Sequence, residues 1–338
     1  MKPPRSALMD RYGRQVRDLR VSLTDRCNLR CSYCMPAEGL EWLPAEETLT
    51  DDEVVRLIKL AIDHFSITSV RFTGGEPLLR KGLADIASRI HSYAPTVNLA
   101  ITTNALGLDK KAAALVQAGV SRANISLDSL NPPTYAQVAR RDRLGDALAG
   151  IAAAQAAGMD PIKINTVVMR GVNDREPTKL LRFCLERGYQ LRFIEQMPLG
   201  PKHQWDRQAM ITQAEILQTL ADEFDLTPVG AERGSSPAQQ WLARDKRDGK
   251  EGSVGVIASV TAPFCGSCDR SRLTADGQLR NCLFATTETD LRTPLRGGAT
   301  DAEIAQLWRE GTWLKAAGHL IGDDDFQSPD RTMSRIGG

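Results

Sequence analysis

The stretch Asp18-Leu-Arg-Val-Ser-Leu-Thr-Asp-Arg-Cys-Asn-Leu-Arg-Cys-Ser-Tyr-Cys34 carries the strongest signals for both the fold and the chemistry of this chain. Its first half, Leu19–Thr24, is an apolar and β-branched run with the length of a buried strand. Cys27, Cys31 and Cys34, here called the first triplet, follow at once with C-x3-C-x2-C spacing. The stretch therefore predicts a strand that delivers three thiols to one loop.

Similar short runs recur downstream, and helical patterns separate them. The expected strands are Leu19–Thr24, Ser69–Thr73, Val97–Thr102, Arg122–Leu127, Ile162–Met169 and Gln190–Glu195. The expected helices lie near residues 51–64, 82–92, 109–118, 145–157 and 176–187. This alternation predicts an α/β fold with parallel strands and right-handed crossovers. Six units are fewer than the eight of a closed barrel, so we expect a partial (β/α)6 TIM-like barrel, with an open doubly wound sheet as the alternative.

The pattern changes after residue 195. A loop over 197–205 precedes an expected helix, Thr212–Glu223, and residues 231–251 show neither a helical nor a strand period. A short strand, Val254–Val260, then leads to a second group of cysteines. We expect an N-terminal arm (1–15), a barrel (16–230) and a C-terminal domain (231–338) that closes the open side of the barrel.

The composition is that of an ordinary globular protein. Of the 338 residues, 42% are hydrophobic and 25% are charged, and the formal net charge is +1. This balance argues against bulk binding to nucleic acid. No stretch approaches the run of about 18 apolar residues that spans a membrane. The first ten residues are polar and lack a signal-peptide core, so we expect a cytoplasmic protein that binds neither nucleic acid nor membrane.

The first triplet has the character of a metal site, because cytoplasmic cysteines stay reduced and clustered ones more often bind metal than form disulfides. Three thiolates on one loop can hold three irons of a cubane and leave the fourth iron open. Structural zinc usually takes four N or S ligands, and none of the four histidines lies near the triplet in sequence. We therefore predict a 4Fe–4S cluster, with zinc or a disulfide as the alternatives.

Cys265, Cys268 and Cys282 form a second triplet toward the other end of the chain. A zinc ribbon needs a fourth ligand that the local sequence lacks. We expect a second 4Fe–4S cluster, whose open iron binds substrate or passes an electron. The seventh cysteine, Cys184, lies alone and is expected to be a buried helical thiol.

Basic residues accompany the second triplet and the expected strands. Arg270-Ser271-Arg272 offers two forked donors suited to phosphate or a carbonyl-bearing base, although a solvated strand face is the alternative. Four more cations lie at or near strand positions, namely Arg20, Arg71, Lys163 and Arg192. Cations inside a barrel cost free energy unless an anion pairs with them. If they face inward they predict a ligand such as a triphosphate, and if they face helices or solvent they do not.

With Tyr33 before its last cysteine, the first triplet resembles the signature of the radical S-adenosylmethionine (SAM) superfamily. Gly74-Gly-Glu-Pro77 follows the second expected strand, as does the methionine-binding segment of that superfamily. Its glycines allow close approach to a ligand, and its carbonyls with Glu76 suit an ammonium group. The resemblance implies a partial barrel and a cluster whose electron splits SAM into methionine and a 5′-deoxyadenosyl radical.

Over nearly its whole length the chain is similar to one family, the GTP 3′,8-cyclases that begin molybdenum cofactor biosynthesis. The matching segments are Gly13-Arg-Gln-Val-Arg-Asp-Leu-Arg20, Thr24-Asp-Arg-Cys-Asn-Leu-Arg-Cys31, Tyr33-Cys-Met-Pro36, Arg71-Phe-Thr-Gly-Gly-Glu-Pro77, Ile125-Ser-Leu-Asp128, Arg192-Phe-Ile-Glu195, the Cys265 loop, Asp276-Gly277, Cys282-Leu-Phe-Ala285 and the final Gly337-Gly338.

The resemblance implies roles for individual residues. The two triplets would hold the two clusters, and the contacts to SAM would come from Tyr33, Gly75, Ser126 and Met197. The contacts to GTP would come from Arg20, Arg71, Thr102, Lys163, Arg270, Ser271 and Arg272. Further candidates are Arg192, Glu76 and the diglycine tail, Gly337 and Gly338, which would enter the active site near the arginines.

The same resemblance implies the reaction. The adenosyl radical would remove the ribose C3′ hydrogen of GTP, and the carbon radical would attack guanine C8. The implied partners are an electron donor and a downstream cyclic pyranopterin monophosphate synthase. The protein itself is expected to be a monomer or a homodimer. The rival interpretations are a two-cluster radical enzyme that modifies a peptide and a non-catalytic, metal-stabilised binding protein.

Overall fold

The computed structural model describes residues 7–200, 205–230, 233–321 and 326–337. Its strands form one sheet in the order β12-β11-β10-β1-β2-β3-β4-β5-β6-β9-β8-β7. The six central strands run parallel, each beside the next in sequence. They are β1 (Asp18–Ser22), β2 (Ser69–Thr73), β3 (Asn98–Thr103), β4 (Val120–Ser126), β5 (Ile162–Val168) and β6 (Gln190–Glu195). The six predicted strands are all present, and the predicted α/β class is confirmed.

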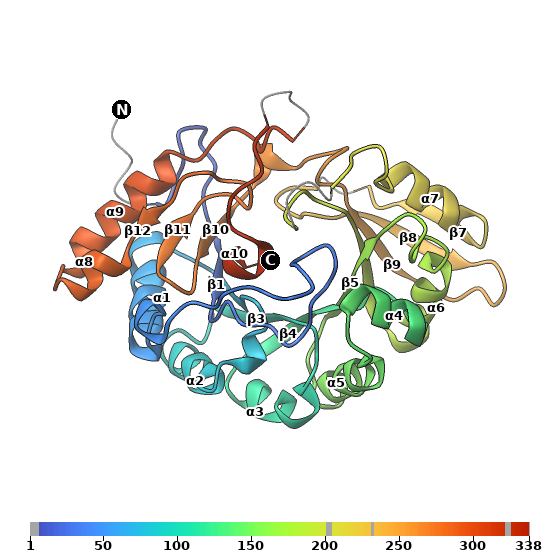
Figure 1. Cartoon of the computed structure of the whole chain (residues 1–338), viewed down its shortest axis with the longest axis horizontal. Helices are drawn as coiled ribbons and strands as arrows, with labels where there is room; N and C mark the ends of the chain where they lie inside the picture. The colour runs from blue at the N-terminus through green and yellow to red at the C-terminus, as the bar shows by residue number, and fades with distance from the viewer. Residues whose placement is uncertain (1–6, 201–204, 231–232, 322–325, 338) are drawn as a thin grey trace.

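Helices cover the outer side of this curved sheet (Figure 1). They are α1 (Asp51–Phe65), α2 (Leu83–Tyr93), α3 (Ala112–Gln117), α5 (Leu144–Ala156) and α6 (Pro177–Arg187), all close to the predicted ranges. Helix α4 (Pro132–Ala139) was not predicted. Its signal is a capping asparagine, Asn131, before two prolines, because proline suits the first turn of a helix.

The C-terminal part of the chain extends the sheet at both edges. At one edge β9 (Glu251–Ile257) lies parallel to β6, followed by β8 (Gln239–Asp245) and β7 (Phe224–Pro228). At the other edge β10 (Arg270–Leu273) lies parallel to β1, followed by β11 (Gln278–Arg280) and β12 (Thr289–Asp290). The remaining helices are α7 (Gln213–Ala221), α8 (Arg292–Arg296), α9 (Asp301–Trp313) and α10 (Met333–Ile336).

The prediction that residues 231–251 lack a strand was wrong. Strand β8 lies within this range, and Trp241, Ala243 and Asp245 are its buried residues. The alternation was hidden because one inward residue, Asp245, is an acid. Its buried carboxylate is paired with Arg182 at 2.6 Å, which makes its burial tolerable.

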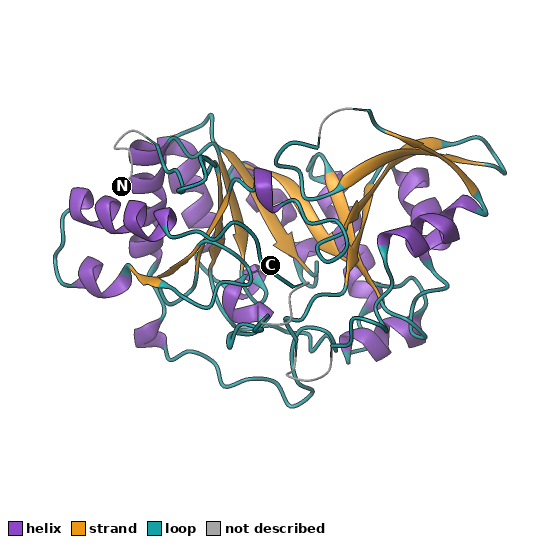
Figure 2. Cartoon of the chain, turned by 90° about the horizontal axis from the view of Figure 1, so that it is seen from above, coloured by secondary structure: helices purple, strands orange, loops and turns teal. Residues whose placement is uncertain are grey.

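The inner face of the arc is polar, whereas the apolar core lies between the sheet and the outer helices. On β1, Leu19 and Val21 belong to the core. Successive strand residues alternate between faces, so Arg20 points to the inner side. Helix α10 lies on this inner side (Figure 1). Seen from above, the strands occupy the middle of the molecule, with helices to the left and right of them (Figure 2). None of the helices described combines the length and the apolar character that a membrane crossing needs.

Candidate active site

The loop after β1 carries the first triplet and is anchored on α4, the helix that sequence reasoning missed. Arg30 N donates to Ala139 O at 3.1 Å, and Ser32 N donates to Val138 O at 2.9 Å. Within the loop, Cys31 O accepts hydrogen bonds from the next turn of backbone. The positions of the thiols are therefore fixed by main-chain contacts on both the strand and the helix side.

The first-triplet thiols lie close enough to influence one another. Burial raises the pKa of Cys27 to about 11, and burial with the Cys27 thiol raises the pKa of Cys34 to about 12. Burial, with the Asp128 carboxylate and the two other thiols, raises the pKa of Cys31 well above its usual value. Three buried thiolates are costly without a cation, so this loop suits iron, which binds the thiolate form.

Gly74 and Gly75 bring β2 against the backbone that leads into the first triplet. Gly75 N donates to Thr24 O at 2.8 Å. A Cβ on Gly75 would lie 2.3 Å from Arg26 O, and a Cβ on Gly74 would lie 2.2 Å from Thr24 O. The glycines are thus required for close packing of chain on chain, and this explains their place without any ligand contact.

Glu76 is 1% exposed, and protein donors engage both of its oxygens. Thr103 Oγ1 donates to Oε1 at 2.7 Å, and Asn104 N donates to Oε2 at 2.8 Å. Burial raises the pKa of Glu76 to about 7. The carboxyl joins the loop after β2 to the loop after β3, so it orders the cavity wall in addition to any contact with a ligand.

The predicted SAM contacts all line one cavity beside the first triplet. Tyr33, Gly75, Ser126 and Met197 come from four different parts of the chain and meet there, together with Glu76 and Thr102. The cavity has a volume of about 190 Å³. Their convergence follows from the parallel sheet, because the loops at the carboxyl ends of parallel strands meet at one edge.

Asp128 is a residue of this cavity that the sequence reasoning quoted only within a motif. Its Oδ2 accepts from Tyr33 Oη at 2.9 Å, and its Oδ1 accepts from Val167 N at 2.9 Å. Burial raises the pKa of Asp128 to about 6. The pair fixes the tyrosine ring of the cysteine loop against β4 and β5.

A hairpin assembles the second triplet. Cys265 and Cys268 precede β10, and β11 returns antiparallel to β10 so that Cys282 comes back toward the same end. Burial raises the pKa of Cys268, but Lys315 and Arg270 lower it by more, so the net shift is downward. The thiol of Cys265 accepts the His319 N–H. Lys315 and His319 were not predicted, because they lie far along the chain, after α9.

The predicted cations face one another across the inner side of the sheet. The register places Arg20 of β1 beside Arg71 of β2 and Arg272 of β10. Lys163 interacts electrostatically with Arg192 and Arg71. Arg122 of β4, which the sequence reasoning missed, adds to both Lys163 and Arg192. We call this group the cation cluster: Arg20, Arg71, Arg122, Lys163, Arg192, Arg270 and Arg272.

The cation cluster carries more charge than its surroundings neutralise. Two acids lie within it: Asp18, with Oδ2 at 3.7 to 3.9 Å from Arg20, Arg71 and Arg270, and Asp269, with Oδ1 at 4.0 Å from Arg270. Burial and neighbouring cations lower the pKa of Lys163 to about 8 and of Arg192 to about 9. The buried Nε atoms of Arg20 and Arg71 have no hydrogen-bond partner. Such groups favour a buried polyanion, which would raise these pKa values and supply acceptors.

Two predicted GTP contacts lie differently from the arginines. Ser271 pairs with Leu19 in the register of β10 and β1, so its side chain points away from the cation cluster. Only its backbone lies between the two arginines. Thr102 sits at the carboxyl end of β3 and lines the cavity of the first triplet. It therefore lies on the side of the cation cluster that faces the SAM contacts.

The last described residues, Ile336 and Gly337, contact strands β1 and β10. Ile336 O accepts from Ser22 Oγ at 3.1 Å, and Gly337 O accepts from Arg272 Nε at 3.3 Å. Gly337 has φ +86°, and a Cβ there would lie 2.0 Å from Ser22 Oγ. Gly338 lies outside the described residues. The absence of a side chain at residue 337 therefore allows the backbone to come close enough to contact Arg272.

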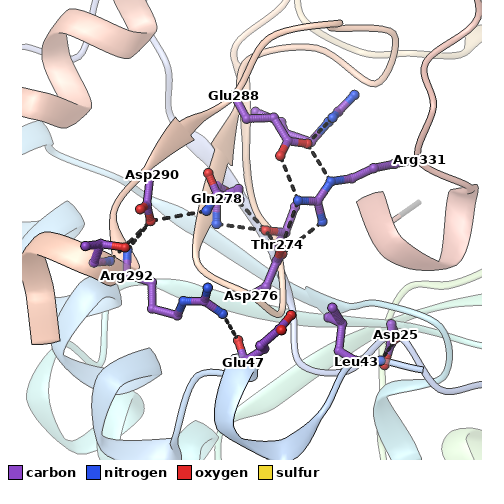
Figure 3. A network of polar contacts seen from close by, with 12 residues as sticks. Asp25, Leu43, Glu47, Thr274, Asp276, Gln278, Glu288, Asp290, Arg292 and Arg331 are labelled. Atoms are coloured by element: carbon purple, nitrogen blue, oxygen red, sulfur yellow. Dashed lines mark hydrogen bonds and ion pairs between the residues drawn. The ribbon is translucent and has the colours of Figure 1, made fainter. Parts of the chain in front are cut away.

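An ionic clamp holds the segment before the tail (Figure 3). Arg331 makes a bidentate pair with Asp276, at 2.8 and 3.0 Å, and also contacts Glu288 at 2.7 Å. Asp276 is itself held by Thr274 Oγ1 at 2.6 Å, in the turn between β10 and β11. The hairpin that carries the second triplet thus also fixes the approach of the tail.

Helix α10 links the two triplets. The Ser334 N–H donates to the thiol of Cys34, while Gly337, three residues on, contacts Arg272. Arg272 in turn interacts electrostatically with Cys282 and Cys268. The two triplets therefore open onto the same interior, with the cation cluster beside them.

The donor sets fit iron–sulfur clusters. Each triplet supplies three thiols that influence one another electrostatically. In the described part of the chain, no three His, Cys, Asp or Glu side chains converge on one metal ion. A cubane does not require that convergence, because each thiolate binds a different iron.

A model of the radical SAM superfamily matches residues 21–184. Among solved structures, SuiB of Streptococcus suis bound to S-adenosylmethionine has a TM-score of 0.54 and 13% identity, covering 81% of this chain and 63% of that chain. A further SuiB structure has a TM-score of 0.55. At such identity the likeness concerns the fold alone. Fold, cysteine loop and superfamily model together define a radical SAM enzyme, a class that implies a 4Fe–4S cluster and SAM.

The particular family follows from relatives at higher identity. A Molybdenum Cofactor Synthesis C model matches residues 189–321. The GTP 3′,8-cyclase of Corynebacterium glutamicum is 57% identical over 98% of this chain and 89% of its own length. That of Streptomyces coelicolor is 55% identical over 98% of this chain and 96% of its own. The chain belongs to the GTP 3′,8-cyclase family, and the predicted family is confirmed.

Proposed function

We propose that this protein converts GTP into (8S)-3′,8-cyclo-7,8-dihydroguanosine 5′-triphosphate, the first step of molybdenum cofactor biosynthesis. The observation that carries the proposal is the cation cluster, which lies on the inner side of the sheet and is only partly neutralised by Asp18 and Asp269. A buried polyanion is the ligand that such a group favours. GTP supplies both the polyanion and the nucleoside that the reaction needs.

The first triplet would hold a cluster with an iron open to SAM, and Tyr33, Gly75, Ser126 and Met197 would contact SAM in the adjoining cavity. The second triplet would hold a cluster whose open iron faces guanine. When bound, these groups would supply a 5′-deoxyadenosyl radical to remove the C3′ hydrogen. After C3′ joins C8, they would also supply the electron that, together with a proton, completes the 7,8-dihydro product.

The residues of the chain bind and orient the two substrates. Arg20, Arg71 and Lys163 would hold the triphosphate, and Arg192 and Arg122 would extend that site. Arg270 and Arg272 would orient guanine toward the second triplet, with the Ser271 backbone between them. Thr102 would lie between GTP and SAM. Ile336 is fully buried, so helix α10 would help to exclude water from the radical.

At the level of architecture, we propose a partial (β/α)6 barrel whose open side the C-terminal part and its diglycine tail close. The arm (1–15), barrel (16–230) and C-terminal domain (231–338) remain the proposed partition. The product would pass to a cyclic pyranopterin monophosphate synthase, an electron donor would reduce the clusters, and the cytoplasm is the expected compartment. A peptide-modifying role would leave the cation cluster without a purpose.

An anaerobic assay tests the proposal. Protein reconstituted with iron and sulfide is incubated with dithionite, SAM and GTP, and we expect 5′-deoxyadenosine and a cyclised nucleotide in equal amounts. Arg272→Ala should lose cyclisation at unchanged iron content, whereas Arg247→Ala, an exposed arginine of the β8–β9 turn, should behave as the parent. Cleavage of SAM at a rate that ignores GTP would contradict the assignment of the substrate.

A further inference from the structure

A short segment after α9 lies against the second triplet. We call Lys315-Ala-Ala-Gly-His319 the strap. The Lys315 side chain is buried, with 3% of the residue exposed. Its Nζ donates to Cys268 O at 3.0 Å and to Arg270 O at 2.9 Å, and lies 3.5 Å from Cys268 Sγ. One ammonium therefore binds the backbone on both sides of Asp269 and also the sulfur of a predicted iron ligand.

The strap contacts a second sulfur through its backbone. The His319 N–H donates to the Cys265 thiol. The N-terminal arm fastens the strap, because Arg14 donates to Cys265 O at 2.7 Å and to Ala317 O at 2.9 Å. Arg14 is itself paired with the buried Asp10 at 2.5 Å. Two of the three sulfurs thus accept hydrogen bonds from one segment that is locked in place.

The charge on Lys315 is directed at sulfur. The groups that act on it electrostatically are the Cys268 and Cys282 thiols, which attract it, and Arg14, which repels it. Arg14 has a carboxylate partner in Asp10, whereas the described contacts of Lys315 are two carbonyls and a thiol. A buried ammonium is costly unless an anion compensates it. A thiolate that carries iron is the compensating group which this geometry offers.

We propose that Lys315 is a positioning residue of the second cluster, which holds the Cys265–Cys268 loop and raises the reduction potential of the cluster through its charge and its hydrogen bond to Cys268 Sγ. Reduction adds one negative charge to a cluster, and hydrogen bonds and cations near its sulfurs stabilise that charge. The proposal rests on the proposed function only in that the second triplet holds a cluster.

The test isolates the second cluster. Cys27, Cys31 and Cys34 are all changed to alanine, the protein is reconstituted with iron and sulfide, and iron content and midpoint potential are measured by redox titration with EPR detection. Lys315→Met keeps the length of the side chain and removes its charge and donors. We expect a lower midpoint for Lys315→Met and a midpoint near that of the parent for Lys315→Arg.

Two further variants complete the design. Lys246→Met removes an exposed lysine of the β8–β9 turn and should leave the midpoint unchanged. Lys315→Gln keeps an N–H donor without the charge and should give an intermediate midpoint potential. This potential can be measured even if Lys315→Met does not retain iron. A midpoint equal to that of the parent in an iron-replete Lys315→Met or Lys315→Gln protein would overturn the inference. Failure of the parent itself to take up iron would instead overturn the proposed second cluster.

Discussion

Each of the two cysteine triplets presents three thiols, but the charged groups around the two triplets differ. Near the first triplet, the Asp128 and Glu76 carboxyls add to burial in raising the thiol pKa values. Near the second, Lys315, Arg270 and Arg272 oppose burial at Cys268, whose pKa falls below its usual value, whereas burial raises the pKa of Cys265. One triplet lies among acids and hydroxyls, the other among cations.

This difference separates two kinds of information. The cysteines specify that a cluster can bind, but the charged and polar groups around them specify which kind of ligand would suit the space beside it. An acidic and hydroxyl-rich wall suits the ammonium and sulfonium charges of SAM, whereas a cationic wall suits a nucleoside triphosphate. The difference is also expected to separate the reduction potentials, because nearby positive charge favours the reduced cluster.

The largest expected effects come from removing one ligand in each region. Cys31→Ser should lower the rate of SAM cleavage by roughly a thousandfold or more, because the cluster that starts the reaction is lost. Cys268→Ser should retain cleavage of SAM and lose the cyclised nucleotide to a similar extent. Quantifying 5′-deoxyadenosine and nucleotide product in the same reaction checks both. Equal loss of cleavage in the two variants would erase the functional distinction between the triplets.

A substitution at the tail tests the link between the regions. Gly337→Ala would place a Cβ 2.0 Å from Ser22 Oγ, and we expect cyclisation to fall by about 10- to 100-fold with both clusters intact, as misplacement of a positioning element does. Gly298→Ala is the matched control, since Gly298 has φ +85° and nothing within 4 Å of its missing Cβ. Equal effects of the two changes on activity would show that backbone strain, not tail position, is responsible.

The two ligand sites should differ in how binding depends on pH, because GTP affinity should fall at high pH and SAM affinity at low pH. Lys163, whose pKa is about 8, would bind phosphate in its protonated form, so GTP affinity should fall up to about tenfold per pH unit above pH 8. Asp128, whose pKa is about 6, accepts from Tyr33 as a carboxylate, so SAM affinity should fall as the pH drops through 6.

Measuring the dissociation constants of GTP and SAM from pH 5 to 9 checks these two pH dependences. Lys163→Met should make the loss of GTP affinity at high pH less steep, with Arg192, whose pKa is about 9, still contributing. Asp128→Asn should make the loss of SAM affinity at low pH less steep, with Glu76, whose pKa is about 7, still contributing. If either variant altered the pH dependence of binding of the other ligand, the two regions would not titrate independently.

The smallest expected effect concerns stability. Arg71 is partly buried, and this burial with nearby arginines lowers its pKa, while Asp18 partly opposes this. Arg71→Met should therefore stabilise the nucleotide-free protein by about 1 kcal/mol, because replacing a poorly compensated buried charge by an apolar group of similar size is often stabilising. Thermal unfolding with and without GTP checks this, and the variant should lose most of the stabilisation that GTP gives the parent. A lower melting temperature without nucleotide would mean that Asp18 already compensates the arginine.

Much of the fold could be predicted because each strand from β1 to β6 carries its own apolar signal. Strand β8 could not, since Asp245 occupies a buried position and only its pairing with Arg182 makes that acceptable. Helix α4 was missed because it is short, although Asn131 marks its start. In the site, the cysteines and most of the cations were visible as types and spacings, whereas Arg122 looked like an ordinary strand residue.

The sequence by itself determined the alternation of six strands with helices, the two cysteine triplets and the family, because these depend on local periodicity and on short motifs. Only the tertiary structure decided that Arg20, Arg71 and Arg272 face one another, that Ser271 turns away, and that Lys315 touches Cys268. The reason is physical. A strand's pattern states that its faces alternate, but which side chains meet across strands depends on register, and contacts between segments far apart in sequence exist only after the chain has folded.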